Sequence, residues 1–331
     1  MKNITLRTTL FLAMLASAGG AAADCGTVTI ANMNWQSAEV LANIDKIILS
    51  EGFGCQVELI AGDTVPSITS MAEKGQPDIA PEGWVNTVPD IVKHGVEEGK
   101  LQIVSEPLSD GGVQGLWIPK YVAEAHPEIK TIQDALKHPE LFPAPEDAGK
   151  GAIFTSPQGW GAATIIGQLY KAYGGEKAGF VLVDPGSAAG LDGSLAKAYE
   201  RKQPWMGYYW APTSLLGKYE MVKLGHGVEY GEAEWKRCTT VTDCPDPAPN
   251  DWPKDKVDTI VTKKFAQRAG AALDYLKART WSNDTVNKLS AWMTDNQAGG
   301  DEAARYFLKS NPDIWSKWIS PDVIEKVKAA L

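Results

Sequence analysis

Tryptophan is the residue type whose placement in this sequence points most directly to chemistry. Four tryptophans stand in short polar segments: Trp35 in NMNWQSAE, Trp84 in PEGWVNT, Trp160 in SPQGWGAA and Trp210 in YYWAPT. By contrast, Trp292, Trp315 and Trp318 fall inside amphipathic helical patterns, where a packing role is expected. Indole faces attract cations that cannot donate an N–H hydrogen bond. The four loop tryptophans therefore predict a cage for a quaternary ammonium group.

Polar groups beside these tryptophans complete the predicted site. Glu82 precedes Trp84 by two residues and is expected to turn a carboxylate toward the cation, although a solvated turn residue is the alternative. Gly161 and Ala162 stand where a helix begins after Trp160. The free backbone N–H groups of a helix N-terminus favour an anionic ligand group. We therefore expect the ligand to have a cationic end and an anionic end.

Catalytic chemistry is not predicted. The four histidines, His94, His126, His138 and His226, are scattered along the chain, and no H-E-x-x-H, G-x-S-x-G or phosphate-loop pattern occurs. An enzyme acting on a methylamine would need a redox cofactor or a metal site, and the sequence shows neither. We predict a protein that is not an enzyme and carries no cofactor.

Alternating strands and helices must position the tryptophans. Strands are predicted at 27–33, 57–60, 78–80, 101–105, 115–118, 152–155, 180–183, 205–210 and 257–263. Helices are predicted at 37–51, 65–74, 90–99, 131–137, 162–173, 191–201, 265–277, 283–296, 301–311 and 321–331. All four loop tryptophans then follow or end strands. The carboxyl ends of strands form the crevice in which open α/β sheets bind ligands.

The pattern runs twice along the chain and predicts an α/β clamshell of two lobes, each a mostly parallel sheet flanked by helices. Residues 24–113 and 224–331 are expected to form the first lobe and residues 114–223 the second. A C-terminal segment that returns to the first lobe gives two crossings between the lobes, which makes a hinge.

The N-terminus is typical of a cleaved secretory signal. Basic residues Lys2 and Arg7 precede a short apolar run, LFLAMLA, and a small-residue site that ends at Ala23. The run is shorter than the roughly 20 residues that span a bilayer. We expect cleavage after Ala23 and a periplasmic location. A buried N-terminal helix and a lipoprotein modified at Cys25 are the alternatives, and Asp24 disfavours the second.

Charge and cysteine content narrow the function further. The formal charge is −9, and −11 once Lys2 and Arg7 are removed, without a basic cluster, which excludes a nucleic-acid partner. We expect a monomer.

In an oxidising compartment the four cysteines predict disulfides. The short loop CTTVTDC favours Cys238–Cys244, which leaves Cys25–Cys55. The alternative, a four-thiol zinc site, lacks C-x-x-C spacing.

The acidic segment around the second cysteine pair offers oxygen ligands. Asp243, Asp246 and Asp251 lie in CTTVTDCPDPAPNDWPKD and could hold a structural Ca²⁺. The alternative is a solvated acidic loop.

The motifs PEGWVNT, PQGWGAA and YYWAPT resemble those of glycine betaine-binding proteins of ABC importers, in which the three tryptophans form a cage. The resemblance covers most of the chain after Ala23. It implies a type II periplasmic-binding-protein clamshell, a membrane permease as partner, and a ligand carboxylate held by the backbone of Gly161 and Ala162. Trp35 adds a fourth aromatic, as in relatives that bind trimethylamine N-oxide or choline.

Glycine betaine or trimethylamine N-oxide is therefore the expected ligand, and choline or carnitine is the alternative. A ligand-sensing module that reports to a membrane partner would use the same pocket and is the alternative of another class.

Overall fold

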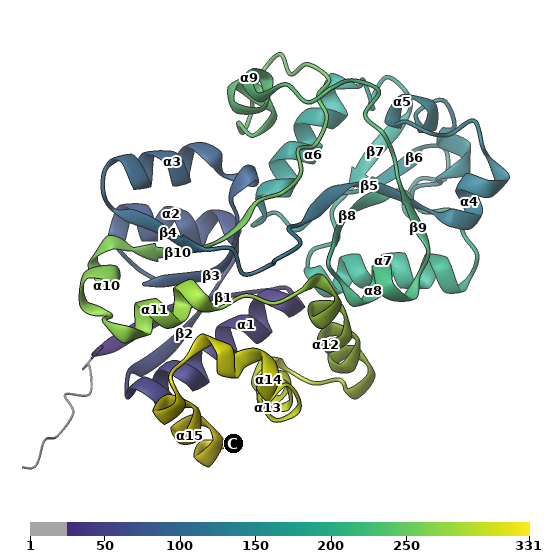
Figure 1. Ribbon diagram of the computed structural model, residues 1–331. Helices are drawn as coiled ribbons and strands as arrows, with labels where there is room; N and C mark the ends of the chain where they lie inside the picture. Colours follow the sequence, from purple (N-terminus) through teal and green to yellow (C-terminus); the bar gives the residue numbers. More distant parts are fainter. Residues whose placement is uncertain (1–24) are drawn as a thin grey trace, which may run out of the picture.

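The computed structural model describes residues 25–331, which form two lobes, each built around a five-stranded sheet (Figure 1). The predicted signal peptide, residues 1–23, lies outside the described residues. No helix within residues 25–331 combines the length and the apolar character needed to cross a bilayer.

The first lobe contains a sheet with the strand order β2-β1-β3-β10-β4. Its strands are β1 (Thr27–Met33), β2 (Gln56–Gly62), β3 (Ile79–Trp84), β4 (Leu101–Ser105) and β10 (Val257–Thr262). Strand β1 pairs in parallel with β2 and β3, whereas β10 runs antiparallel to both β3 and β4. The sheet is thus mostly parallel, as predicted, with one reversed strand that arrives from the C-terminal part of the chain.

Helices pack against this sheet because their apolar residues recur on one side. Leu41 and Ile44 of the first helix are completely buried, and this helix contacts β1, β2 and β3. The helices are α1 (Gln36–Ile47), α2 (Thr64–Lys74), α3 (Pro89–Glu97), α10 (Lys263–Arg268), α11 (Ala271–Ala278), α12 (Asn283–Asn296), α13 (Gly300–Ser310), α14 (Pro312–Trp315) and α15 (Pro321–Ala330). Short helical turns add η1 (Ile48–Gly52), η2 (Val85–Thr87) and η5 (Ser316–Trp318).

The second lobe repeats this plan with the strand order β7-β6-β8-β5-β9. Its strands are β5 (Val113–Pro119), β6 (Gly151–Phe154), β7 (Phe180–Val183), β8 (Gly207–Ala211) and β9 (Met221–Lys223). Strand β5 is antiparallel to both of its neighbours, β8 and β9, while β6 is parallel to β7 and β8. One reversed strand again lies within an otherwise parallel sheet.

The helices of the second lobe include α6, which follows the third motif tryptophan. They are α4 (Lys120–Ala125), α5 (Ile132–Ala135), η3 (Pro139–Leu141), α6 (Gly161–Ala172), α7 (Ala188–Glu200) and α8 (Ser214–Lys218). A further excursion after β9 contains α9 (Glu232–Glu234) and η4 (Trp235–Thr239), and it lies next to α6 (Figure 1).

The chain crosses between the lobes twice, and the two crossings lie side by side (Figure 1). Gly112 and Asp255 form an isolated antiparallel bridge, in which each backbone N–H donates to the other residue's carbonyl at 3.2 Å. A pair of adjacent crossings restricts the relative motion of the lobes to bending about that pair.

Among the local differences from the sequence expectation, one helix and one strand have a clear physical reason. The single helix predicted at 265–277 is interrupted between α10 and α11 at Gly270, whose φ of 52° a helix cannot contain. Strand β9 was not predicted, because three residues are too few to show an alternating pattern.

Both predicted disulfides are confirmed. Cys25–Cys55 joins the residues just before β1 and β2, with Cα atoms 5.2 Å apart, and these strands pair in parallel from their first residues. Cys238–Cys244 closes the short loop after α9, with Cα atoms 5.4 Å apart. The four-thiol alternative is therefore wrong.

Candidate ligand-binding site

The four predicted tryptophans meet around one cavity between the lobes. Trp35 and Trp160 occupy the N-cap positions of α1 and α6, Trp84 ends β3, and Trp210 lies near the end of β8. Each is at most 6% exposed. The cavity has an empty volume of about 270 Å³, and its remaining lining residues are Thr64, Thr87, Gln114, Gly161, Ala162 and Tyr208.

The indoles are arranged as walls rather than as a stack. The ring of Trp160 stands nearly perpendicular to those of Trp35 and Trp210, at interplanar angles of 74° and 85° and centroid distances of 5.4 and 4.9 Å. Perpendicular rings present faces in different directions. Such a box can surround a compact cation with π faces on several sides.

Glu82 holds two of these indoles in place. Its Oε1 accepts hydrogen bonds from Trp35 Nε1 at 2.7 Å, from Trp84 Nε1 at 3.1 Å and from Ser37 Oγ at 2.9 Å. The residue is 0% exposed and is absent from the residues that line the cavity. The carboxylate predicted to face the cation therefore lies behind the indoles and binds their N–H edges.

The electrostatic state of Glu82 follows from its surroundings. Burial raises the pKa of the carboxyl above its ordinary value, and the three hydrogen bonds together with the charge of Arg279 offset part of this rise. Arg279 is itself buried and pairs with Asp45 at 2.9 Å. The ionised form of Glu82 would place a negative charge next to two cage rings.

Close contacts join the two lobes at the edge of the cavity. Trp160 Nε1 donates to Asn34 Oδ1 at 2.7 Å, and the backbone N–H of Val65 donates to the carbonyl of Gly159 at 3.2 Å. A Cβ on Gly161 would lie 2.6 Å from the Cβ of Thr87. The lobes are thus closed, and this approach requires a residue without a side chain at position 161.

Gly161 and Ala162 line the cavity as the first residues of the twelve-residue helix α6. The first N–H groups of a helix have no partner within it, and the helix dipole favours an anion there. This position agrees with the predicted role of the two residues. The cavity therefore joins aromatic faces to a helix N-terminus.

Sequence reasoning missed Tyr208 and Gln114. Tyr208 precedes Trp210 by two residues, so both side chains point to the same face of β8, and this alternation was a usable signal. Gln114 lies on β5 directly opposite Trp210, and it accepts a hydrogen bond from the Tyr208 hydroxyl at 2.5 Å. The pairing of β5 with β8 is a tertiary fact that no local motif revealed.

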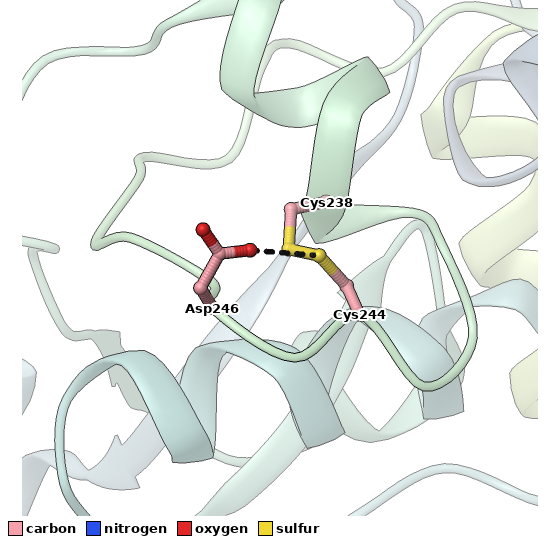
Figure 2. Close-up of side chains that lie close together, drawn as sticks. All are labelled: Cys238, Cys244 and Asp246. Atoms are coloured by element: carbon pink, nitrogen blue, oxygen red, sulfur yellow. Dashed lines mark hydrogen bonds between the residues drawn. A yellow bond between two sulfur atoms is a disulfide. The ribbon is translucent and has the colours of Figure 1, made fainter.

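The structure does not bring the three predicted calcium ligands together. Within residues 25–331, the one group of three metal-ligand side chains that converges is Cys238, Cys244 and Asp246 (Figure 2). The two sulfurs form a disulfide, so neither is a free thiolate that can bind a metal.

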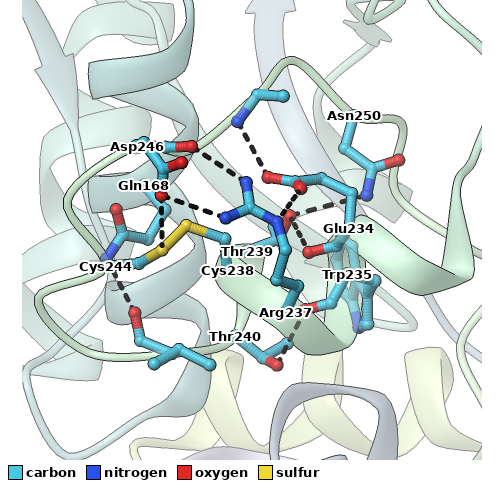
Figure 3. The surroundings of a disulfide bond; sticks show 12 residues. Gln168, Glu234, Trp235, Arg237, Cys238, Thr239, Thr240, Cys244, Asp246 and Asn250 are labelled. Carbon is cyan, nitrogen blue, oxygen red and sulfur yellow. Dashed lines mark hydrogen bonds and ion pairs between the residues drawn. A yellow bond between two sulfur atoms is a disulfide. The ribbon is translucent and has the colours of Figure 1, made fainter.

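Asp246, the remaining member, is engaged by Arg237, which donates from Nη1 to Asp246 Oδ1 at 3.0 Å and from Nη2 to its carbonyl at 2.9 Å (Figure 3). Asp251 Oδ1 accepts from the backbone N–H of Trp252 at 2.7 Å. An Arg–carboxylate pair and a disulfide thus organise this loop, and calcium binding by Asp243, Asp246 and Asp251 stays a prediction.

Comparison with known proteins identifies a family and agrees with this fold. The model of the OpuAC family, described as the substrate binding domain of ABC-type glycine betaine transport systems, matches residues 26–310.

Three solved structures share the fold at low sequence identity. A choline-binding ABC-transporter protein in complex with choline superposes with a TM-score of 0.72 at 19% identity, covering 92% of this chain and 98% of that one. The glycine betaine/L-proline-binding protein ProX from Borrelia burgdorferi superposes with a TM-score of 0.71 at 18% sequence identity, covering 91% of this chain and 99% of that one. Lactococcal OpuAC in its closed form with glycine betaine superposes with a TM-score of 0.66 at 20% sequence identity, covering 89% of this chain and 100% of that one.

Proposed function

Because the chain belongs to the family of substrate-binding domains of ABC-type glycine betaine transport systems, we propose that it binds glycine betaine or trimethylamine N-oxide in its tryptophan cage. Proteins of this family bind small quaternary ammonium ligands and work with an ABC permease. The observation that carries the proposal is the meeting of the buried side chains of Trp35, Trp84, Trp160 and Trp210 around one cavity.

Physical chemistry supports a methylated ammonium as the bound group. Such a cation has no N–H to donate, and within the lining residues no charged side chain competes with the rings for it. Each cation–π contact contributes about 0.5–2 kcal/mol, and more when water is excluded. Several contacts plus burial of the methyl groups can reach micromolar affinity, about −8 kcal/mol.

Delivery to a membrane permease completes the proposed role. We propose export by the N-terminal signal and action as a periplasmic monomer. Closure of the lobes over the ligand gives the permease a shape to recognise. A sensing module would use the same closure, and a pull-down that captures a kinase-type membrane protein in place of a permease would favour that alternative.

Calorimetric titration of residues 24–331 with glycine betaine, trimethylamine N-oxide, choline and carnitine tests the proposal. One-to-one binding of a methylated amine is expected.

Trp84→Ala should weaken the binding of the methylated amine about 10- to 100-fold, because a ring face and a buried wall are lost. Trp292→Ala is the matched control, since Trp292 stacks on Tyr306 on the first lobe, outside the cavity. Absence of binding to all four compounds would refute the cage.

A further inference from the structure

Gln114 is one of the polar residues that line the cavity. The residue is 2% exposed and lines the cavity between the indoles. Its Nε2 is buried, and no atom of the described residues accepts a hydrogen bond from it. Buried amide groups almost always have a partner in native proteins. An unpartnered donor in a ligand cavity therefore calls for an acceptor on the ligand.

A hydrogen bond from Tyr208 sets the orientation of the Gln114 amide. Tyr208 donates its hydroxyl proton to Gln114 Oε1 at 2.5 Å. Burial raises the pKa of Tyr208 well above its ordinary value, so the hydroxyl stays protonated and remains a donor. The amide oxygen is thus occupied by Tyr208. The NH₂ group carries the remaining hydrogen-bonding capacity of the side chain, two N–H donors.

The carboxyl of Asp255 lies close to Gln114. Burial raises the pKa of its carboxyl to about 7, and the side chain and backbone of Gln114 act in the opposite direction. A primary amide carries two N–H groups. One can serve Asp255 while the other serves the cavity, so the presence of Asp255 does not exhaust the donor capacity of Gln114.

The lining as a whole favours a ligand without net charge. It contains no Asp, Glu, Lys or Arg side chain, and it combines the aromatic rings with the Gln114 amide and the N-terminal end of α6. A zwitterion satisfies both halves of such a cavity. A plain cation would leave the amide donor unpaired.

We infer that Gln114 is a specificity-determining donor that selects ammonium ligands bearing an anionic oxygen, either carboxylate or N-oxide, over choline and tetramethylammonium. This inference rests on the proposed function and adds the chemical class of the ligand's second end.

Isosteric replacement of the amide tests the inference. Gln114→Glu turns the free donor into an acceptor, and Gln114→Met removes it without adding a charge. Calorimetry should show affinity for glycine betaine and trimethylamine N-oxide reduced about tenfold or more in both variants. Affinity for tetramethylammonium should stay within about twofold in Gln114→Met and should rise in Gln114→Glu, because a carboxylate then faces the cation.

The matched control is Gln168→Glu. Gln168 is a buried glutamine of the same lobe, and its Nε2 donates to the Val241 carbonyl at 2.7 Å, away from the cavity (Figure 3). This variant should keep the wild-type ranking of ligands. Thermal melting of each variant separates loss of binding from loss of folding.

The outcomes distinguish the two proposals. If the wild-type protein binds neither tetramethylammonium nor any oxygen-bearing methylamine, the proposed function fails and the inference with it. If the wild-type protein binds tetramethylammonium as tightly as glycine betaine, or if Gln114→Met weakens all ligands equally, the role of Gln114 is refuted while the cage stands. The ranking of glycine betaine against trimethylamine N-oxide separates carboxylate from N-oxide.

Discussion

Glu82 shows how a single residue can shape a cavity that it does not line. One carboxylate oxygen receives the N–H groups of Trp35 and Trp84 and the hydroxyl of Ser37. These bonds fix the orientation of two rings that belong to different segments of the chain. The ionised carboxylate also adds negative potential behind those rings. Burial opposes that ionisation, so binding and protonation are coupled at this residue.

Affinity for glycine betaine should fall in acid because of Glu82. Its pKa is raised by burial, and a bound cation favours the ionised form, so binding must lower that pKa. By linkage, affinity is full above the raised pKa and decreases as the pH falls through it. Titration calorimetry across the acidic range measures this loss.

Glu82→Gln provides the comparison for that experiment. The variant should bind about tenfold or more weakly at neutral pH, and its affinity should depend less on pH. Asp192 and Asp255 also have raised pKa values, of about 6 and about 7, so the difference between the two proteins isolates Glu82. Equal pH profiles in both proteins would contradict the assignment. Exposed Glu58→Gln, on β2, controls for the loss of one charge.

At the scale of secondary structure, helix α6 does two things at once. Its N-terminus lines the cavity, and its first residue, Gly161, approaches Thr87 of the other lobe so closely that a methyl group does not fit. The helix therefore presents its free N–H groups at the point where the lobes meet. The contact between the lobes and the lining of the cavity thus share the same short segment.

Gly161→Ala should weaken ligand binding about tenfold or more by obstructing closure, with little change in thermal stability of the free protein. The added Cβ would lie 2.6 Å from Thr87 Cβ and 2.7 Å from its carbonyl oxygen, contacts that exist only between lobes. Calorimetry gives the affinity, and small-angle scattering with saturating ligand gives the degree of closure.

Gly167→Ala, in the middle of the same helix, is the matched control. A Cβ there meets no atom within 4 Å, so binding should be unchanged and stability equal or higher. A Gly161→Ala protein that binds and closes normally would show that the lobes approach differently in solution.

The whole molecule consists of two similar sheets linked by two adjacent crossings. It contains two disulfides, Cys25–Cys55 and Cys238–Cys244. Cys25–Cys55 spans 30 residues of sequence and joins the first two strands of the first lobe. Cys238–Cys244 spans 6 residues and closes a loop that Arg237 also holds. The first bridge removes more freedom from the unfolded chain.

Replacement of each cysteine pair by serine should therefore have unequal effects. The loop-entropy relation gives about 3–4 kcal/mol for Cys25–Cys55 and about 2 kcal/mol for Cys238–Cys244. Denaturant unfolding of the two double variants measures both values, and ligand affinity should change little in either. A larger loss from the short loop than from the long one would contradict the entropic account.

Local pattern determined much of this protein in advance. Alternating strands and helices placed Trp35, Trp84, Trp160 and Trp210 at strand ends, and parallel sheets gather such ends at one edge, so the meeting of the four indoles could be predicted. The short spacing of Cys238 and Cys244 likewise decided both disulfides. These features depend on residues close in sequence or on a general rule of sheet geometry.

Tertiary structure alone decided the rest. Glu82 turns toward indole N–H groups, Gln114 meets Tyr208 across 94 residues of sequence, and Asp246 pairs with Arg237. A side chain's direction is set by the partners that folding brings beside it. Those partners come from distant segments, so composition, periodicity and motif spacing do not contain the answer.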